Sequence, residues 1–131
     1  MSENDFVFDA SEVSASGQDA TTQFRRAGDF VFVSGLYSPA GESIQAQTRA
    51  CIQQLSDVLE DAGGSLENLV EVTTYLARMT DFAGYNEAYG RLFSVNGPAR
   101  TTVSVEQLGH PDALIEMRGV AYIAANTTIA T

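Results

Sequence analysis

The stretch Gly28-Asp29-Phe30-Val31-Phe32-Val33-Ser34-Gly35 holds an aromatic and β-branched run between two glycine-containing pairs. Such a run favours a buried β-strand, and the glycine pairs are typical of the turns that begin and stop it. Between Ser43 and Ala62, apolar residues recur instead at steps of three and four. This period predicts an amphipathic helix, with Ser43 as its N-terminal cap and Gly63-Gly64 at its end.

The rest of the chain continues to alternate between strand and helix patterns. Residues 69–77 predict a strand with one face made by Val70, Val72, Thr74 and Leu76. A second helix is expected after Thr80-Asp81, with four aromatic residues on one face: Phe82, Tyr85, Tyr89 and Phe93. Residues 99–105 and 114–123 predict two further strands that pair with each other, and residues 5–10 a short one.

This order of elements indicates an α/β or α+β sandwich in which both helices pack on one face of a sheet. The run from Phe30 to Val33 suggests that the other face is apolar as well, which favours oligomers. No repeat or linker divides the 131 residues, so a single domain spanning residues 1–131 is expected.

Composition excludes several classes of protein. The chain has 17 acidic and 7 basic side chains, a formal charge of −10, and all seven cations are arginines. A charge of this sign without a basic cluster argues against nucleic acid and anionic membranes as partners. One cysteine, Cys51, and one histidine, His110, are too few for a cysteine- or histidine-based metal centre. The acidic N-terminus resembles no secretory signal or transit peptide, so a cytoplasmic location is expected.

Three polar positions are candidates for chemistry. Arg100 opens a predicted strand on the same face as Thr102, and a guanidinium binds carboxylates in a bidentate fork. Glu116 and Arg118 share one face of the last strand, where an ion pair between them is the simplest interpretation. Asn86 is either a core amide or a ligand-binding side chain. An arginine for a carboxylate and a glutamate for water suit the hydrolysis of a small, activated acid. Cys51 is interpreted as a core residue and His110 as a surface turn residue.

An ordered set of motifs from about Phe24 to Ile123 resembles the Rid (reactive intermediate deaminase, RidA/YjgF-like) family. The set comprises residues 28–35, Val58-Leu59-Glu60-Asp61-Ala62-Gly63-Gly64, Asp81-Phe82-Ala83-Gly84-Tyr85-Asn86-Glu87-Ala88-Tyr89, Gly97-Pro98-Ala99-Arg100-Thr101-Thr102-Val103 and Ile115-Glu116.

The resemblance implies a chorismate-mutase-like α+β fold with a mixed sheet of about six strands, assembled as a homotrimer with sites in the clefts between subunits. It also implies a cofactor-free, metal-free deaminase that hydrolyses 2-enamino and 2-imino acids to 2-oxo acids and ammonia. Arg100 would bind the substrate carboxylate and Glu116 would position water. Ser34 and Asn86 would line the cleft.

The sequence departs from the family pattern near these positions. Thr102 replaces the cysteine usual two residues after the arginine, and Arg118 replaces the second acid of the last strand. The turn before Glu116 is one residue longer, and Phe24 is the nearest counterpart of a tyrosine usual before the first matched strand. Arg118 leaves two hypotheses open: it holds Glu116 unproductive in a trimer that only binds small carboxylates or proteins, or it recognises an aminomuconate-like dicarboxylate.

Overall fold

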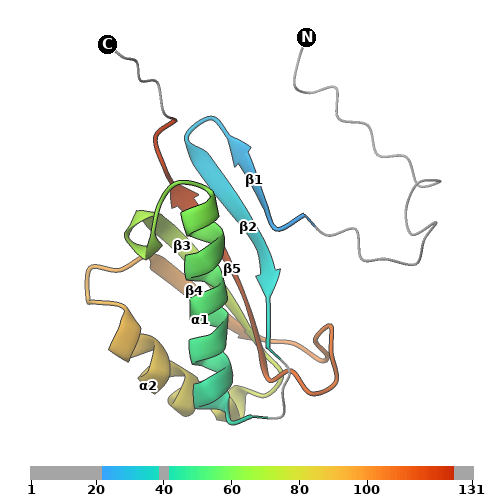
Figure 1. Ribbon diagram of the computed structural model, residues 1–131. Helices are drawn as coiled ribbons and strands as arrows, with labels where there is room; N and C mark the ends of the chain where they lie inside the picture. Colours follow the sequence, from blue (N-terminus) through green and yellow to red (C-terminus); the bar gives the residue numbers. More distant parts are fainter. Residues whose placement is uncertain (1–21, 39–41, 126–131) are drawn as a thin grey trace, which may run out of the picture.

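The computed structural model describes residues 22–38 and 42–125. These ranges contain five strands and two α-helices, with a 3₁₀ turn before β3 and another before α2 (Figure 1). The elements follow in the order β1 (Phe24–Ala27), β2 (Phe30–Leu36), α1 (Ile44–Asp61), η3 (Leu66–Asn68), β3 (Leu69–Leu76), η4 (Met79–Asp81), α2 (Phe82–Leu92), β4 (Ala99–Ser104) and β5 (Ile115–Tyr122). The strand expected at residues 5–10 lies outside the described residues.

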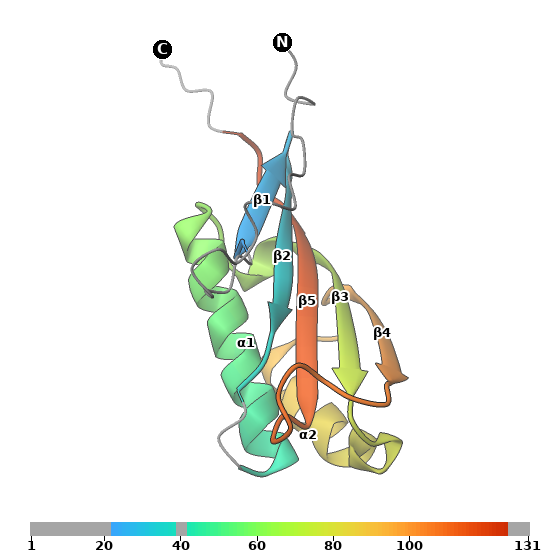
Figure 2. The same ribbon diagram turned by 90° about the vertical axis from the view of Figure 1, so that its right-hand side faces the viewer.

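The five strands form one mixed sheet in the order β1-β2-β5-β3-β4 (Figure 2). Neighbouring strands are antiparallel except β3 and β4, which are parallel and are therefore joined by a crossover through α2. The expected pairing of the last two strands is wrong. The crossover through α2 places β4 against one side of β3, where it forms the edge of the sheet. β5 pairs with the other side of β3 and lies between β3 and β2.

The hairpin of β1 and β2 corrects two further expectations. β1 was not predicted, because Arg25-Arg26 interrupts its apolar pattern, yet it pairs with β2 along its whole length through a turn with Gly28 at φ 63°. Ser34-Gly35 does not stop the strand. The pair forms an irregularity in the register with β5, and β2 continues to Leu36.

α1 confirms the predicted helix almost to the residue. The Ser43 side chain accepts a hydrogen bond from the Ala46 amide, and Gly63 adopts φ 95° just beyond the end of the helix. The apolar stripe is buried against the sheet, with Cys51, Leu55 and Leu59 fully inaccessible. This helix supplies most of the core on one side of the sheet.

α2 carries the predicted row of aromatic rings. Successive members, from Phe82 through Tyr85 and Tyr89 to Phe93, lie 4.5–5.8 Å apart between ring centroids. The predicted cap is only partly right, because Asp81 occupies the N-cap position but its carboxylate pairs with Arg78 instead of the helix amides.

The two faces of the sheet differ in what covers them. Both helices lie against the same face (Figures 1 and 2), which buries Val31, Val33, Val72, Leu76, Ile115 and Met117. The predicted apolar character of the open face is confirmed by Phe30, Phe32, Val103 and Tyr122, each 39–46% exposed. Val70, expected on the buried face, is 44% exposed because the register with β5 shifts between Leu69 and Glu71. The molecule is an α+β sandwich with both helices on one face.

Candidate functional site

The six predicted site residues fall into two groups on opposite faces of the sheet. Arg100 and Thr102 lie on the helix side of β4, near Asn86 of α2. Ser34, Glu116 and Arg118 lie on the open side of β2 and β5. We call the first group the arginine half-site and the second the glutamate half-site.

Strand register fixes the side to which Arg100 points. In the parallel ladder Arg100 pairs with Val72 and Thr102 with Thr74, and both β3 partners are fully buried beneath the helices. Neighbours in register share a face, so Arg100 and Thr102 project toward α2. The Arg100 guanidinium carbon lies 4.5 Å from the ring centroid of Tyr89 and 5.5 Å from that of Tyr85.

The Arg100 side chain is exposed and forms no ion pair with a carboxylate within residues 22–38 and 42–125. Its five N–H donors are therefore not committed to an acidic side chain in this part of the chain. A guanidinium in this condition is suited to binding a carboxylate from outside.

Thr102 belongs to a chain of three hydroxyl groups. The Tyr85 hydroxyl lies 2.8 Å from Thr74 Oγ1 and 3.3 Å from Thr102 Oγ1. Tyr85 and Thr74 are fully buried, whereas Thr102 is half-buried at the edge of the sheet. The Thr102 hydroxyl, at the position of the family's cysteine, is thus hydrogen-bonded to the buried Tyr85.

Asn86 is exposed on α2, so the interpretation as a core amide is wrong. It lines a hollow of about 360 Å³ together with Tyr89 and Arg100 and the residues that connect α2 to β4. The structure therefore brings Asn86 and Arg100 to one hollow, and Thr102 lies next to them through its contact with Tyr85.

On the other face, Glu116 lies over Gly35. Glu116 pairs with Tyr75, which points away from the helices, and its neighbours Ile115 and Met117 are fully buried on the helix side. A Cβ added at Gly35 would lie 2.0 Å from Glu116 Oε2 and 2.8 Å from Cδ. Gly35 thus provides the space that the carboxylate occupies.

Burial raises the pKa of Glu116 above its usual value of 4.5. The carboxyl group borders a hollow of about 260 Å³ with Gly35, Tyr75 and Arg118. A carboxylate whose pKa is raised is a stronger base than an ordinary one, and this one is open to a hollow, so it can accept a proton from a molecule bound there.

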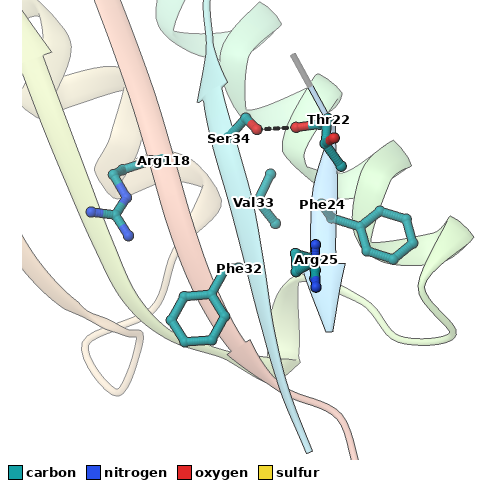
Figure 3. Close-up of a pocket in the computed structure, with 7 residues that line it drawn as sticks. All are labelled: Thr22, Phe24, Arg25, Phe32, Val33, Ser34 and Arg118. Atoms are coloured by element: carbon teal, nitrogen blue, oxygen red, sulfur yellow. Dashed lines mark hydrogen bonds between the residues drawn. The ribbon is translucent and has the colours of Figure 1, made fainter. Parts of the chain in front are cut away.

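Arg118 shares the open face with Glu116, as predicted, but no ion pair joins the two among the described residues. Its side chain borders the hollow of Glu116 and a second hollow of about 420 Å³ that includes Phe32, Ser34 and Arg25 (Figure 3). Ser34 donates its hydroxyl hydrogen to the carbonyl oxygen of Thr22, a bond drawn in Figure 3.

The two residues given structural roles are placed accordingly. Cys51 is fully buried, its thiol contacts the Leu36 carbonyl at 3.4 Å, and burial together with the nearby Glu116 charge raises its pKa to about 12. His110 lies in the loop before β5, where its Nδ1 accepts a hydrogen bond from the Asp112 amide.

Within residues 22–38 and 42–125 no group of three His, Cys, Asp or Glu side chains is arranged to hold a metal ion. No helix of the same ranges is long and apolar enough to cross a bilayer.

Sequence reasoning missed Gly35 as the partner of Glu116 and the contact of Tyr85 and Tyr89 with Arg100. Gly35 gave only a turn signal, and the tyrosines gave the periodic signal of a core helix. Both contacts join segments that are distant in sequence, and local pattern carries no information about them.

Comparison with known proteins places this geometry in a family. Residues 14–123 match the family described as Endoribonuclease L-PSP. The chain belongs to this family, which includes the YjgF and RidA proteins.

Relatives within the Endoribonuclease L-PSP family are similar over most of their length. The chain is 40% identical to a RutC family protein of Pyrococcus abyssi over 77% of this chain and 84% of that protein. It is 34% identical to the 3-aminoacrylate deaminase RutC of Acinetobacter baylyi over 75% and 82% of the two chains. The crystal structure of yeast Mmf1 matches with a TM-score of 0.76 and 30% identity, covering 81% of this chain and 89% of the other. RidA from an Antarctic Psychrobacter matches with a TM-score of 0.73 and 28% identity, over 80% and 89%.

Proposed function

We propose that the chain is a cofactor-free deaminase that hydrolyses reactive 2-enamino and 2-imino acids to 2-oxo acids and ammonia. The observation that carries the proposal is the exposed Arg100 guanidinium. It lies beside a hollow and forms no ion pair with an acidic side chain of the described ranges. The similarity to a relative named as a 3-aminoacrylate deaminase supports the same reaction class.

The proposed reaction requires only that the protein orient the substrate and water and transfer protons. An enamine first takes a proton at its β-carbon and gives up one from its nitrogen, which yields the imine. Water then adds to the C=N carbon, and the resulting carbinolamine loses ammonia to leave the 2-oxo acid. Because the imine is already electrophilic, orientation and proton transfer supply the acceleration. Arg100 would hold the substrate carboxylate, and Glu116 would position the water and receive its proton.

Arg100 and Glu116 cannot serve one small substrate within a single chain, because the sheet separates them. We therefore propose that each site forms between two copies in a homotrimer, with the arginine half-site of one copy facing the glutamate half-site of the next. The exposed apolar side chains of the open face support such an assembly.

The first experiment measures ammonia and 2-oxo acid release from 2-iminopropanoate, generated from alanine by an amino-acid oxidase and read against spontaneous hydrolysis. Arg100→Ala is expected to abolish the acceleration. Arg91→Ala is the matched control, since Arg91 forms an exposed ion pair with Glu87 on the outside of α2. Acceleration that survives Arg100→Ala would refute the role of Arg100.

A second experiment tests the shared site. Arg100→Ala and Glu116→Ala are each expected to be inactive, but unfolding and refolding them together at equal amounts would form mixed trimers. About a quarter of the sites would then combine an intact arginine with an intact glutamate, and activity should return to about that level. Mixing that restores nothing, with trimers demonstrably formed, would refute the shared site.

Arg118 favours a second candidate, a deaminase specialised for an aminomuconate-like dicarboxylate. Its guanidinium borders the hollow of Glu116 and forms no ion pair with Glu116 in the part of the chain the structure describes. It would therefore bind a distal carboxylate. Arg118→Glu is expected to shift the substrate range from unsaturated dicarboxylic to monocarboxylic enamines, and an unchanged range would contradict this candidate.

Two other classes are outcomes of the same assays. Failure with every imine and enamine would favour a trimer that binds carboxylates or proteins without turnover. The family description names an endoribonuclease, but a chain of net charge −10 without a basic cluster is poorly suited to hold RNA. We also propose a cytoplasmic location. Since the yeast relative Mmf1 is named as mitochondrial, this location needs a test, which cell fractionation would provide.

A further inference from the structure

We infer that Tyr85 and Tyr89 are positioning residues that hold the Arg100 guanidinium ready for a substrate carboxylate. The inference rests on the proposed function, in which Arg100 binds that carboxylate. We call the two rings the aromatic platform.

The distances put the guanidinium within reach of both rings. Its carbon lies 4.5 Å from the Tyr89 centroid and 5.5 Å from the Tyr85 centroid, and cation–π attraction operates within about 6 Å. Arg100 sits on an edge strand and is exposed, so its long side chain would otherwise sample many rotamers. The platform restricts this freedom before substrate arrives.

The platform itself is held firmly. Tyr89 stacks on Phe93, with ring centroids 4.5 Å apart and planes at 28°. The ring centroids of Tyr89 and Tyr85 are 5.7 Å apart. Tyr85 is anchored by its hydroxyl, which lies 2.8 Å from Thr74 Oγ1 and 3.3 Å from Thr102 Oγ1. Both tyrosines are buried, so the rings cannot turn away from Arg100 without disturbing the core.

Holding an arginine by rings differs from holding it by an acid. A carboxylate partner would occupy the N–H donors at the edge of the guanidinium, whereas a ring contacts its carbon and leaves those donors available. Arg100 has the ring contacts and lacks the acid among the described residues. The arrangement thus orients the cation without competing for the hydrogen bonds that a substrate carboxylate needs.

For Tyr89 the ring is the active part of the side chain. Its hydroxyl is buried and has no hydrogen-bond partner within the described ranges. Burial, with a further contribution from nearby Tyr85, raises the Tyr89 pKa to about 12, so the phenol is neutral at physiological pH. Tyr89 therefore offers Arg100 a π face and no phenolate charge, and a phenylalanine would serve as well.

The test compares Tyr89→Leu, which removes the ring, with Tyr89→Phe, which keeps it. With 2-iminopropanoate as the probe, Tyr89→Leu is expected to raise KM about two- to fivefold at nearly constant kcat, the size of one exposed cation–π contact. Tyr89→Phe should bring KM back to within error of the wild-type value. Phe82→Leu is the matched control, since Phe82 lies in the same aromatic row and has no cation–π contact with Arg100.

An unchanged KM in Tyr89→Leu, or an equal rise in Tyr89→Phe, would overturn the inference. If Tyr89→Leu does not fold, Tyr89→Met replaces it, because the longer and more flexible methionine side chain adapts to the space of the ring. One measurement needs no variant of the platform: ring currents should shift the Arg100 Nε–H proton resonance upfield of that of exposed Arg91, and coincident shifts would overturn the inference on their own.

Activity measurements on the wild type and on Arg100→Ala distinguish a failure of the platform from a failure of the proposed function. No acceleration by the wild type refutes the proposed function, and full activity in Arg100→Ala refutes the carboxylate-binding role of Arg100, whatever Tyr89 does. Loss of activity in Arg100→Ala together with wild-type KM in Tyr89→Leu refutes the platform alone.

Discussion

Gly35→Ala is expected to disable Glu116 without unfolding the protein. The backbone of Gly35 is not in the left-handed region, so alanine fits the local conformation. The new methyl group would lie 2.0 Å from Glu116 Oε2, whereas ordinary van der Waals contact starts at 3.4 Å. The carboxylate must therefore retreat by about 1.4 Å, the difference between these two distances.

The expected loss follows from that displacement. Misplacing a catalytic group by about 1 Å costs on the order of 100-fold in rate, or about 2.7 kcal/mol of activation free energy. The clashing atoms belong to the end of a flexible, half-buried side chain, so the free energy of unfolding should change by less than about 1 kcal/mol. Loss of activity and retention of stability together are the signature of a displaced carboxylate.

The assay is the release of ammonia from 2-iminopropanoate, with thermal unfolding measured on the same preparations. Gly90→Ala is the control for thermal stability, because a Cβ at Gly90 meets nothing within 4 Å and the added methyl group causes no clash. Activity of Gly35→Ala within twofold of wild type would refute the reasoning. A loss of activity that comes with an equal loss of thermal stability would refute it as well.

Three further predictions concern buried polar groups. Burial raises the Glu116 pKa, so the charged form of this side chain is disfavoured in the folded chain. At pH values above that pKa, Glu116→Gln should therefore raise the melting temperature. The gain should vanish as pH falls below 4.5, and equal gains at pH 4 and pH 7.5 would contradict this prediction. Cys51, with its pKa raised from 9.0 to about 12, should hold about a thousandfold less thiolate at pH 8 than the unfolded chain; alkylation as fast before unfolding as after it would disprove the assignment. Gln47→Leu should cost about 3 kcal/mol in denaturant titration, because the Gln47 amide bonds the backbone of Glu42, Asp112 and Leu114; the exposed Gln53→Leu should change stability by less than about 0.5 kcal/mol.

The helices could be predicted from sequence because their signals are local. The three- and four-residue period of α1 depends only on neighbours along the chain, and so does the Ser43 cap. β1 lacks such a signal: Arg25-Arg26 interrupts it, and the strand exists because it pairs with β2. Arg26 also donates hydrogen bonds to the carbonyls of Ile123, at 2.7 Å, and Ala62, at 3.2 Å.

The site could be predicted only residue by residue. Alternation correctly placed Arg100 with Thr102, and Glu116 with Arg118, on shared faces. It could not show that the two pairs lie on opposite faces, because that depends on which strands are neighbours and in which direction they run. The expected pairing of β4 with β5 was wrong for the same reason: sheet order is set by contacts between distant segments.

The crossover from β3 through α2 to β4 has a consequence for how such proteins diversify. Because the connection folds back over the strand it delivers, the aromatic platform, Asn86, Arg100 and Thr102 all lie within residues 82–102. Ser34, Glu116 and Arg118 lie outside that segment. A recombination that exchanged residues 82–102 between two relatives would transplant one half of the site as a unit and leave the other half as inherited. The residues proposed to bind a carboxylate and those proposed to position water are thus encoded in separable stretches of sequence, and each stretch can change while the other is kept.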